Sequence, residues 1–131
     1  TDIYMRPMSE IRLMGYIASN LKVTKNKFAY IILENDIVAS FNADASSASN
    51  MVNDFSNIEE FVVWLFVTYD AKNDVYKVNI RSRGPVINKL AAKYNGGGHI
   101  YSSGARVKTK EELNNLIVDY DNLCKDYLKN N

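Results

Sequence analysis

The chain has few of the residues on which disulfide and metal chemistry depend. Its 131 residues include one cysteine, Cys124, and one histidine, His99. A single cysteine excludes an internal disulfide, and one His with one Cys cannot complete a closed nitrogen and sulfur site for zinc. Because Cys124 lies on an apolar helical stripe, we expect a buried core thiol.

An excess of charge of either sign is also lacking. Lys and Arg number 16 against 15 Asp and Glu, a net charge of +1. No broad basic field would draw this chain to long nucleic acids, so any nucleic-acid contact must be a local pocket. No apolar run has membrane length and no signal peptide is recognisable, so we expect a cytoplasmic protein without a membrane partner. The chain opens on Thr1 without a methionine, and we expect a C-terminal piece of a longer protein.

The remaining composition, 47% apolar and 24% charged, is that of one globular domain. Periodicity predicts helices over residues 8–21, 34–41, 49–55 and 84–95, and a last helix after the capping box that Thr109 and Glu112 form. Strands are predicted over residues 27–33, 61–69, 75–81 and 104–107. This order indicates the α/β (α+β) class, with a mixed central β-sheet and helices packed on it.

Two elements have patterns that predict which side chains are buried. The helix over residues 8–21 repeats apolar residues at three- and four-residue spacing, in Met8, Ile11, Met14, Ile17 and Leu21. The strand from residue 75 alternates, with Tyr76, Val78, Ile80 and Ser82 on one face and Lys77, Asn79, Arg81 and Arg83 on the other.

The most informative stretch is Gly96-Gly97-Gly98-His99, followed by Ile100-Tyr101-Ser102-Ser103-Gly104. Glycines adopt backbone angles closed to other residues and let a ligand approach the main chain. Successive N–H groups in such a run form an anion-binding concavity. By itself the run also fits a flexible helix C-cap followed by an incidental histidine.

A second constellation, Arg81-Ser82-Arg83-Gly84, ends a predicted central strand just before a helix. A guanidinium forms two parallel hydrogen bonds to a phosphate, a geometry that Lys does not match. Ligand sites favour the ends of strands in open sheets. Without the glycine motif, two solvated arginines would be the simpler interpretation.

Residues 96–104 resemble the signature GGGHxxAAG of the DHH-associated domain, the C-terminal domain of many DHH-type phosphoesterases. Here Ser102 and Ser103 replace the Ala pair and add two hydroxyls. The family includes RecJ-like exonucleases, nanoRNases, phosphatases of 3′-phosphoadenosine 5′-phosphate and cyclic-dinucleotide phosphodiesterases. The resemblance is strongest over residues 61–107. Arg6-Pro7 and residues 11–15 look like the helix that joins the two domains of nanoRNase-type members. This implies an interdomain linker helix over residues 1–22 and a substrate-binding domain over residues 23–131.

The resemblance implies that this domain binds a nucleotide or a short single-stranded oligonucleotide and does not cleave it alone. The substrate-binding residues would be Arg81, Ser82, Arg83, Gly96, Gly97, Gly98, His99, Ser102, Ser103 and Gly104. Catalysis would belong to the N-terminal domain of the same parent chain, a manganese-dependent phosphodiesterase or phosphatase (a hydrolase), which could also form a homodimer. We expect no metal in this piece itself. We further expect Gly97→Ala or Gly98→Ala to impair binding more than folding.

Two other functions stay open at this point. Alanyl-tRNA synthetases carry a related domain, which makes a non-catalytic RNA-binding module the main rival. A plain interaction domain is the third reading, favoured if the glycine stretch binds no anion. Within the phosphoesterase reading, the substrate is an oligoribonucleotide, a cyclic dinucleotide, single-stranded DNA or 3′-phosphoadenosine 5′-phosphate.

Overall fold

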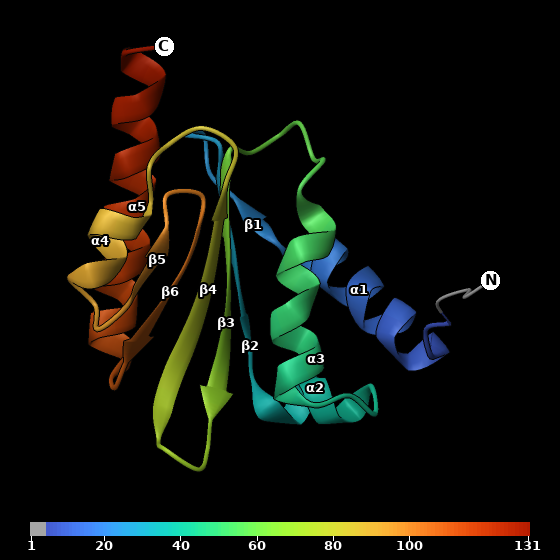
Figure 1. The fold of residues 1–131 in the computed structure, drawn as a ribbon. Helices are drawn as coiled ribbons and strands as arrows, with labels where there is room; N and C mark the ends of the chain where they lie inside the picture. The colour runs from blue at the N-terminus through green and yellow to red at the C-terminus, as the bar shows by residue number, and fades with distance from the viewer. Residues whose placement is uncertain (1–4) are drawn as a thin grey trace.

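A six-stranded mixed sheet separates two layers of helices in the computed structural model, which describes residues 5–131 (Figure 1). The strands are β1 (Lys22–Val23), β2 (Phe28–Leu33), β3 (Val63–Asp70), β4 (Val75–Ser82), β5 (Gly97–His99) and β6 (Ser102–Val107). Their order across the sheet is β1-β2-β3-β4-β6-β5, and only the β2–β3 pair is parallel. The predicted mixed sheet with helices packed on it is confirmed.

The helices divide between the two faces (Figure 1). One layer holds α1 (Met8–Asn20), α2 (Asn35–Ser40), α3 (Ala45–Asn50) and the 3₁₀ turn η1 (Met51–Phe55), and the other holds α4 (Asn88–Ala92) and α5 (Lys110–Lys129). The central strand β3 is buried on both faces: Leu65 and Val67 pack with the α4 and α5 layer, while Trp64 and Phe66 pack with the α1 to η1 layer. The strand predicted over residues 61–69 is therefore confirmed, and its near-continuous apolar run is typical of a strand buried on both faces.

The α1 to η1 layer leaves β4, β6 and β5 largely uncovered within the described residues. Along β4, the half-buried Lys77, Asn79 and Arg81 alternate with Val78 and Ile80, which are fully buried beneath α4 and α5. Register places the matching residues of β6 and β5 on the same side as Lys77. We call this surface the open face, and its residues are Lys77, Asn79, Arg81, Gly97, His99, Ser102, Gly104 and Arg106.

Several element boundaries differ from the sequence expectation. Helix α3 begins at Ala45 because Asp44 caps it, its carboxylate accepting a hydrogen bond from the Ser47 N–H at 2.8 Å. Helix α4 begins only at Asn88, three residues after Pro85. Of the predicted apolar stripe of α1, Ile17 is buried, whereas Met8 and Ile11 are 62% and 45% exposed, and Leu13, which lies outside the stripe, is buried instead.

The predicted domain division assigns residues 1–22 to a linker helix. Residues 1–4 of that range lie outside the described residues. Within the rest, Leu13 and Ile17 of α1 belong to the core cluster that packs against β2 and β3. The helix is therefore anchored to this domain, and its linker role stays a prediction.

Thr109 is the N-cap of α5, as the sequence predicts, and this half of the predicted capping box is open to a direct test. The Glu112 N–H donates to the Thr109 hydroxyl at 3.1 Å, and that hydroxyl lies 3.4 Å from the Glu112 carboxylate. We expect Thr109→Ala to lower the free energy of unfolding by about 1 kcal/mol, because it leaves a helix N–H without its acceptor. Urea denaturation measures this loss. Thr109→Ser keeps the acceptor, and an equal loss in both variants would contradict a capping role.

Candidate functional site

Cross-strand register places Arg81, Ser102 and His99 in one row on the open face. Arg81 of β4 is opposite Ser102 of β6, and Ser102 is opposite His99 of β5. Neighbouring strands lie about 4.8 Å apart, so the Arg81 and His99 backbones are about 10 Å apart with Ser102 between them. Three of the sequence-predicted site residues are thus brought together.

The Arg81 side chain is oriented by the helical layer next to it. Its Nε donates to the Asn53 amide oxygen of η1 at 2.9 Å, and its Nη1 donates to the Ile80 carbonyl at 2.9 Å. Partial burial lowers the pKa of Arg81 from its ordinary value, but a guanidinium stays charged at any physiological pH. A charged group with five N–H donors is therefore held at one end of the row.

His99 lies at the other end of the row, on the edge strand β5, and is exposed. Its carbonyl accepts a hydrogen bond from the Ser103 hydroxyl at 2.7 Å, which ties β5 to β6. An exposed imidazole at an edge can donate to a phosphate or stack on a base. Tyr101 is 47% exposed, so it is not a core residue.

Two glycines leave the middle of the open face flat. Gly97 of β5 is directly opposite Gly104 of β6, and Asn79 of β4 is opposite Gly104 on its other side. A hollow of about 250 Å³ lies over this row, between Lys77, Arg106 and Asn95. Because no side chain stands on the two glycines, a planar ring or a phosphate can approach the main chain there.

The glycine run itself is a strand, so the expectation of a loop whose N–H groups converge on an anion is wrong. In an antiparallel pair the N–H groups of successive residues point to opposite edges. Gly98 has a φ of +136°, and a Cβ added to it would lie 2.7 Å from the Ser102 carbonyl oxygen. This clash exists without any ligand, so Gly98→Ala should lower the stability of the free chain, which weighs against the expectation that it impairs binding more than folding.

Two predicted site serines lie on the opposite side of the sheet from the open face. Ser82 is 8% exposed, and its hydroxyl donates to the Pro85 carbonyl at 2.6 Å and accepts from the Gly84 N–H at 3.1 Å. Ser103 is 5% exposed and bonded to the His99 carbonyl. Both hydroxyls shape the chain around the site and are not brought to its surface.

Arg83 and Gly96 have structural contacts instead of a place in the row. The Arg83 guanidinium donates to the Ser56 carbonyl at 3.0 Å and the Phe61 carbonyl at 2.6 Å, and lies 5.8 Å from the Trp64 ring centroid. Gly96 precedes β5, where the chain passes against the Gly104 backbone. Arg83 therefore holds the loop before β3.

Four residues at the site, Asn53, Lys77, Asn79 and Arg106, are not among those predicted from the sequence. The alternation of β4 placed Lys77 and Asn79 on the same face as Arg81, but it gave no reason to assign them to a ligand site. Asn53 and Arg106 enter through contacts between elements distant in the chain, Asn53 through its bond to Arg81 and Arg106 through the β4–β6 register.

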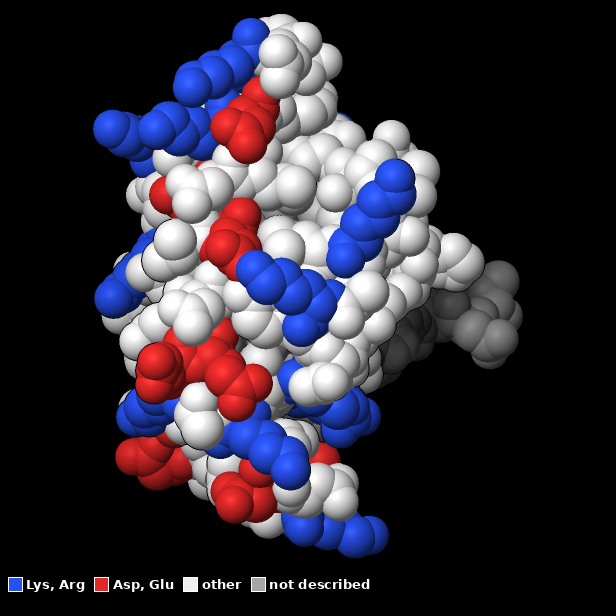
Figure 2. All heavy atoms as spheres, turned by 90° about the vertical axis from the view of Figure 1, so that its left-hand side faces the viewer, with Lys and Arg blue, Asp and Glu red and all other residues white. Residues whose placement is uncertain are grey.

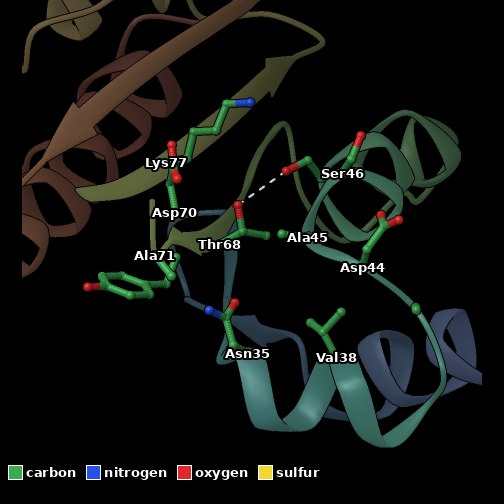
Figure 3. A pocket seen from close by; sticks show the side chains of 12 residues that line it. Asn35, Val38, Asp44, Ala45, Ser46, Thr68, Asp70, Ala71 and Lys77 are labelled. Atoms are coloured by element: carbon green, nitrogen blue, oxygen red, sulfur yellow. Dashed lines mark hydrogen bonds between the residues drawn. The ribbon is translucent and has the colours of Figure 1, made fainter. Parts of the chain in front are cut away.

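A second hollow, of about 400 Å³, continues from Lys77 toward the ends of β3 and α3 (Figure 3). The buried hydroxyls of Ser49 and Thr68 bond to each other at its base, 3.2 Å apart. Asp44 and Asp70 line it from two sides, and hydrogen bonds from Asn73 lower the pKa of Asp70. Two ionised carboxylates repel a phosphate, so the 250 Å³ hollow is the better candidate for an anion.

The outer face formed by α4 and α5 carries both signs of charge. Figure 2 shows Lys and Arg interspersed with Asp and Glu over this face. One such pair joins the two helices, with the Lys93 ammonium 3.1 Å from the Asp119 carboxylate. This face has no field of one sign that would attract a polyanion.

Residues 5–131 also bear on metal binding and membrane insertion. No group of three or more His, Cys, Asp and Glu side chains is placed to hold a metal ion there. In the same part of the chain, no helix has the length and apolar character to cross a membrane. Cys124 is fully buried, which raises the pKa of its thiol to about 12 and confirms a core thiol.

The family model described as the DHHA1 domain matches residues 15–126. The chain belongs to the DHHA1 domain family. The resemblance indicated by the glycine motif is thereby confirmed. The match begins at Gly15, within α1, and includes every strand of the sheet.

This DHHA1 domain is similar to curated bacterial proteins over nearly its full length. It is 35% identical over 126 residues to the bifunctional oligoribonuclease and PAP phosphatase NrnA of Bacillus subtilis, covering 96% of this chain and 40% of that protein. It is 33% identical over 119 residues to the probable bifunctional oligoribonuclease and PAP phosphatase NrnA of Streptococcus mutans, covering 91% and 38%. The chain spans about two fifths of the length of these relatives.

Solved structures agree with the fold of this DHHA1 domain. An exopolyphosphatase-related protein of Bacteroides fragilis matches with a TM-score of 0.76 and 32% identity, covering 92% of this chain and 37% of that one. A pGpG-specific phosphodiesterase, PggH, of Vibrio cholerae matches with a TM-score of 0.67 and 13% identity, over 92% and 40%. The second likeness shows a shared fold only.

Proposed function

We propose that this DHHA1 domain binds a nucleotide or a short single-stranded oligonucleotide on its open face, as the substrate-binding part of a longer phosphoesterase. The observation that supports this most is the row of Arg81, Ser102 and His99, which offers donors to one anion from three strands. The relatives named as oligoribonuclease and PAP phosphatase act on ligands of this chemistry.

Each group in the row has a distinct part in the proposed binding. The Arg81 guanidinium, already oriented by Asn53, presents its remaining edge to phosphate oxygens. The Ser102 hydroxyl donates to the same phosphate, and the His99 ring donates to it or stacks on the adjoining base. The glycine floor beside the row admits the base against the main chain.

Hydrolysis in this proposal depends on a separate catalytic domain of the parent protein, which acts in the cytoplasm. That domain would hold manganese, which activates water for attack on phosphorus. Within residues 5–131 no side-chain cluster fits such a metal. The part of this domain is to hold and orient the substrate.

Arg81→Ala is the direct test of the proposed site. Hydrogen bonds to a charged group contribute about 1.5–3 kcal/mol, so we expect the variant to bind AMP about 10- to 150-fold more weakly. A titration followed by NMR gives both the affinity and the location. In the wild-type chain, we expect the amide signals of Gly97, His99 and Ser102 to move.

Two variants make the Arg81 result specific. Arg81→Lys keeps the charge but lacks the guanidinium fork, so its affinity should lie between those of wild type and Arg81→Ala. Lys89→Ala removes an exposed cation on α4, away from the open face, and should leave binding unchanged. Wild-type affinity in a folded Arg81→Ala variant would refute the proposed site.

A further inference from the structure

Two cations stand opposite each other at the far end of the open face. Lys77 of β4 and Arg106 of β6 are direct cross-strand partners, so their side chains leave the sheet on the same side. Like charges in this position repel and destabilise a sheet. Arg106 forms a long ion pair with Asp70, with 3.9 Å between Nη1 and the carboxylate oxygen, while among the described residues Lys77 has no carboxylate partner. An anion between the two side chains would relieve this repulsion.

The surroundings of the pair fit a nucleotide. The adjoining row is Asn79, Gly104 and Gly97, a flat strip of main chain with one amide side chain at its end. Asn95 lines the same hollow, and its side-chain amide lies 3.5 Å from the Arg106 carbonyl. A phosphate at the cations, a base over the glycines and amide groups at the base edges would fill the hollow.

We propose that Lys77 and Arg106 bind a second phosphate of the ligand held by Arg81, so that the open face selects linked nucleotides over mononucleotides. The inference rests on the proposed function of the Arg81 row. Lys77 and Arg81 are four residues apart on one strand, about 14 Å at 3.4 Å per residue. The ligand that reaches both is a short oligonucleotide lying along β4.

The same geometry limits the length of the ligand. Beyond Lys77, the 400 Å³ hollow is lined by Asp70 and Asp44, which Figure 3 shows on two sides of it. A phosphate continuing past Lys77 would meet these carboxylates. The open face therefore has a basic stretch with an acidic end, which suits an oligonucleotide of a few residues and disfavours a long strand.

The test compares two ligands, AMP and the 5′-phosphorylated trinucleotide pApApA, with the full chain. The wild type should bind pApApA at least tenfold more tightly than AMP. The double variant Lys77→Ala, Arg106→Ala should lose that tenfold preference and keep its affinity for AMP. Its plot of log affinity for pApApA against log salt should also become shallower by about 0.7, the value for one phosphate contact on a single strand.

Controls separate this inference from the proposed function. Lys89→Ala with Lys125→Ala makes the same change in net charge on α4 and α5, away from the open face, and should alter neither affinity. Lys77→Gln with Arg106→Gln repeats the test with longer side chains if the alanine variant folds poorly. An unchanged preference for pApApA in the folded double variant, or its absence in the wild type, overturns the inference. Unchanged binding of both ligands by Arg81→Ala would instead refute the proposed function.

Discussion

Gly96→Ala is expected to destabilise the chain by about 3 kcal/mol or more, at the upper end of what overpacking costs. A Cβ on Gly96 would lie 1.9 Å from the Gly104 carbonyl oxygen and 2.7 Å from the Ala105 Cα. Both are main-chain atoms of β6, so no rotamer change relieves the clash. Gly96 cannot shift outward easily either, because its N–H donates to the Ala91 carbonyl at 3.1 Å.

Urea denaturation followed by circular dichroism measures the Gly96 effect, and Gly15→Ala provides the matched control. Gly15 lies in α1, and nothing stands within 4 Å of an added Cβ. Alanine there should stabilise the helix by about 1 kcal/mol, because it has the higher helix propensity. If Gly96→Ala and Gly15→Ala unfolded at the same urea concentration, the close approach of Gly96 to β6 would be wrong.

The three consecutive glycines should therefore differ when each is replaced by alanine. Gly98→Ala also meets main chain, at 2.7 Å from the Ser102 oxygen, and should lower stability together with binding. At Gly97 an added methyl meets nothing, and the cost is limited to about 1–2 kcal/mol for a backbone at φ +159°. Gly97→Ala is thus the variant that tests ligand approach to the glycine floor.

Trp64→Ala should cost about 3–5 kcal/mol, the usual range for removing a large aromatic side chain from a core. Trp64 is 2% exposed, its ring centroid lies 5.6 Å from that of Phe61, and its Nε1 donates to the Val52 carbonyl at 2.7 Å. That bond fastens η1 to the sheet beside Asn53, which orients Arg81. Losing Trp64 should therefore weaken nucleotide binding as well as folding.

Trp64→Phe separates the packing of the aromatic ring from the hydrogen bond of the indole N–H. It keeps an aromatic ring but leaves the buried Val52 carbonyl without its donor, a loss of about 1–3 kcal/mol. Thermal unfolding and AMP titration, both on variants checked for native dichroism, measure stability and affinity. Wild-type affinity in Trp64→Phe would argue against transmission through η1, and wild-type stability would argue against the hydrogen bond.

Elements with a strong local pattern were predictable from the sequence. The apolar run of β3, the alternation of β4 and the Thr109 cap each depend on residues close together in the chain. The burial of α1 was predicted only in part: Ile17 of the expected stripe is buried, but Met8 and Ile11 at the start of the helix are exposed and Leu13 is buried, because packing on the sheet and not helical spacing alone decides which residues are covered. Strand β5 was missed because glycine has no preference for strands, and its pairing with β6 alone orders it.

The candidate site was predictable in its residue types but not in its arrangement. Arg81 and His99 were both expected to bind the substrate, but only the strand register shows that they lie in one row. Alternation along a strand accounts for Ser103, because its neighbour Ser102 is on the open face and successive side chains leave opposite sides. Arg106 follows only from the β4–β6 register, a contact between residues 29 positions apart that no local pattern encodes.

The facing cations Lys77 and Arg106 would favour ligand binding but lower the stability of the empty domain. A pair that repels across two strands lowers the stability of the empty domain by a few tenths of a kcal/mol up to about 1 kcal/mol. Selection for thermal resistance alone would replace one of the two with a neutral or acidic residue, and a design program that maximised stability would make the same change. Variants stabilised in that way would have a higher melting temperature but would lack one of the two cations that we propose bind phosphate.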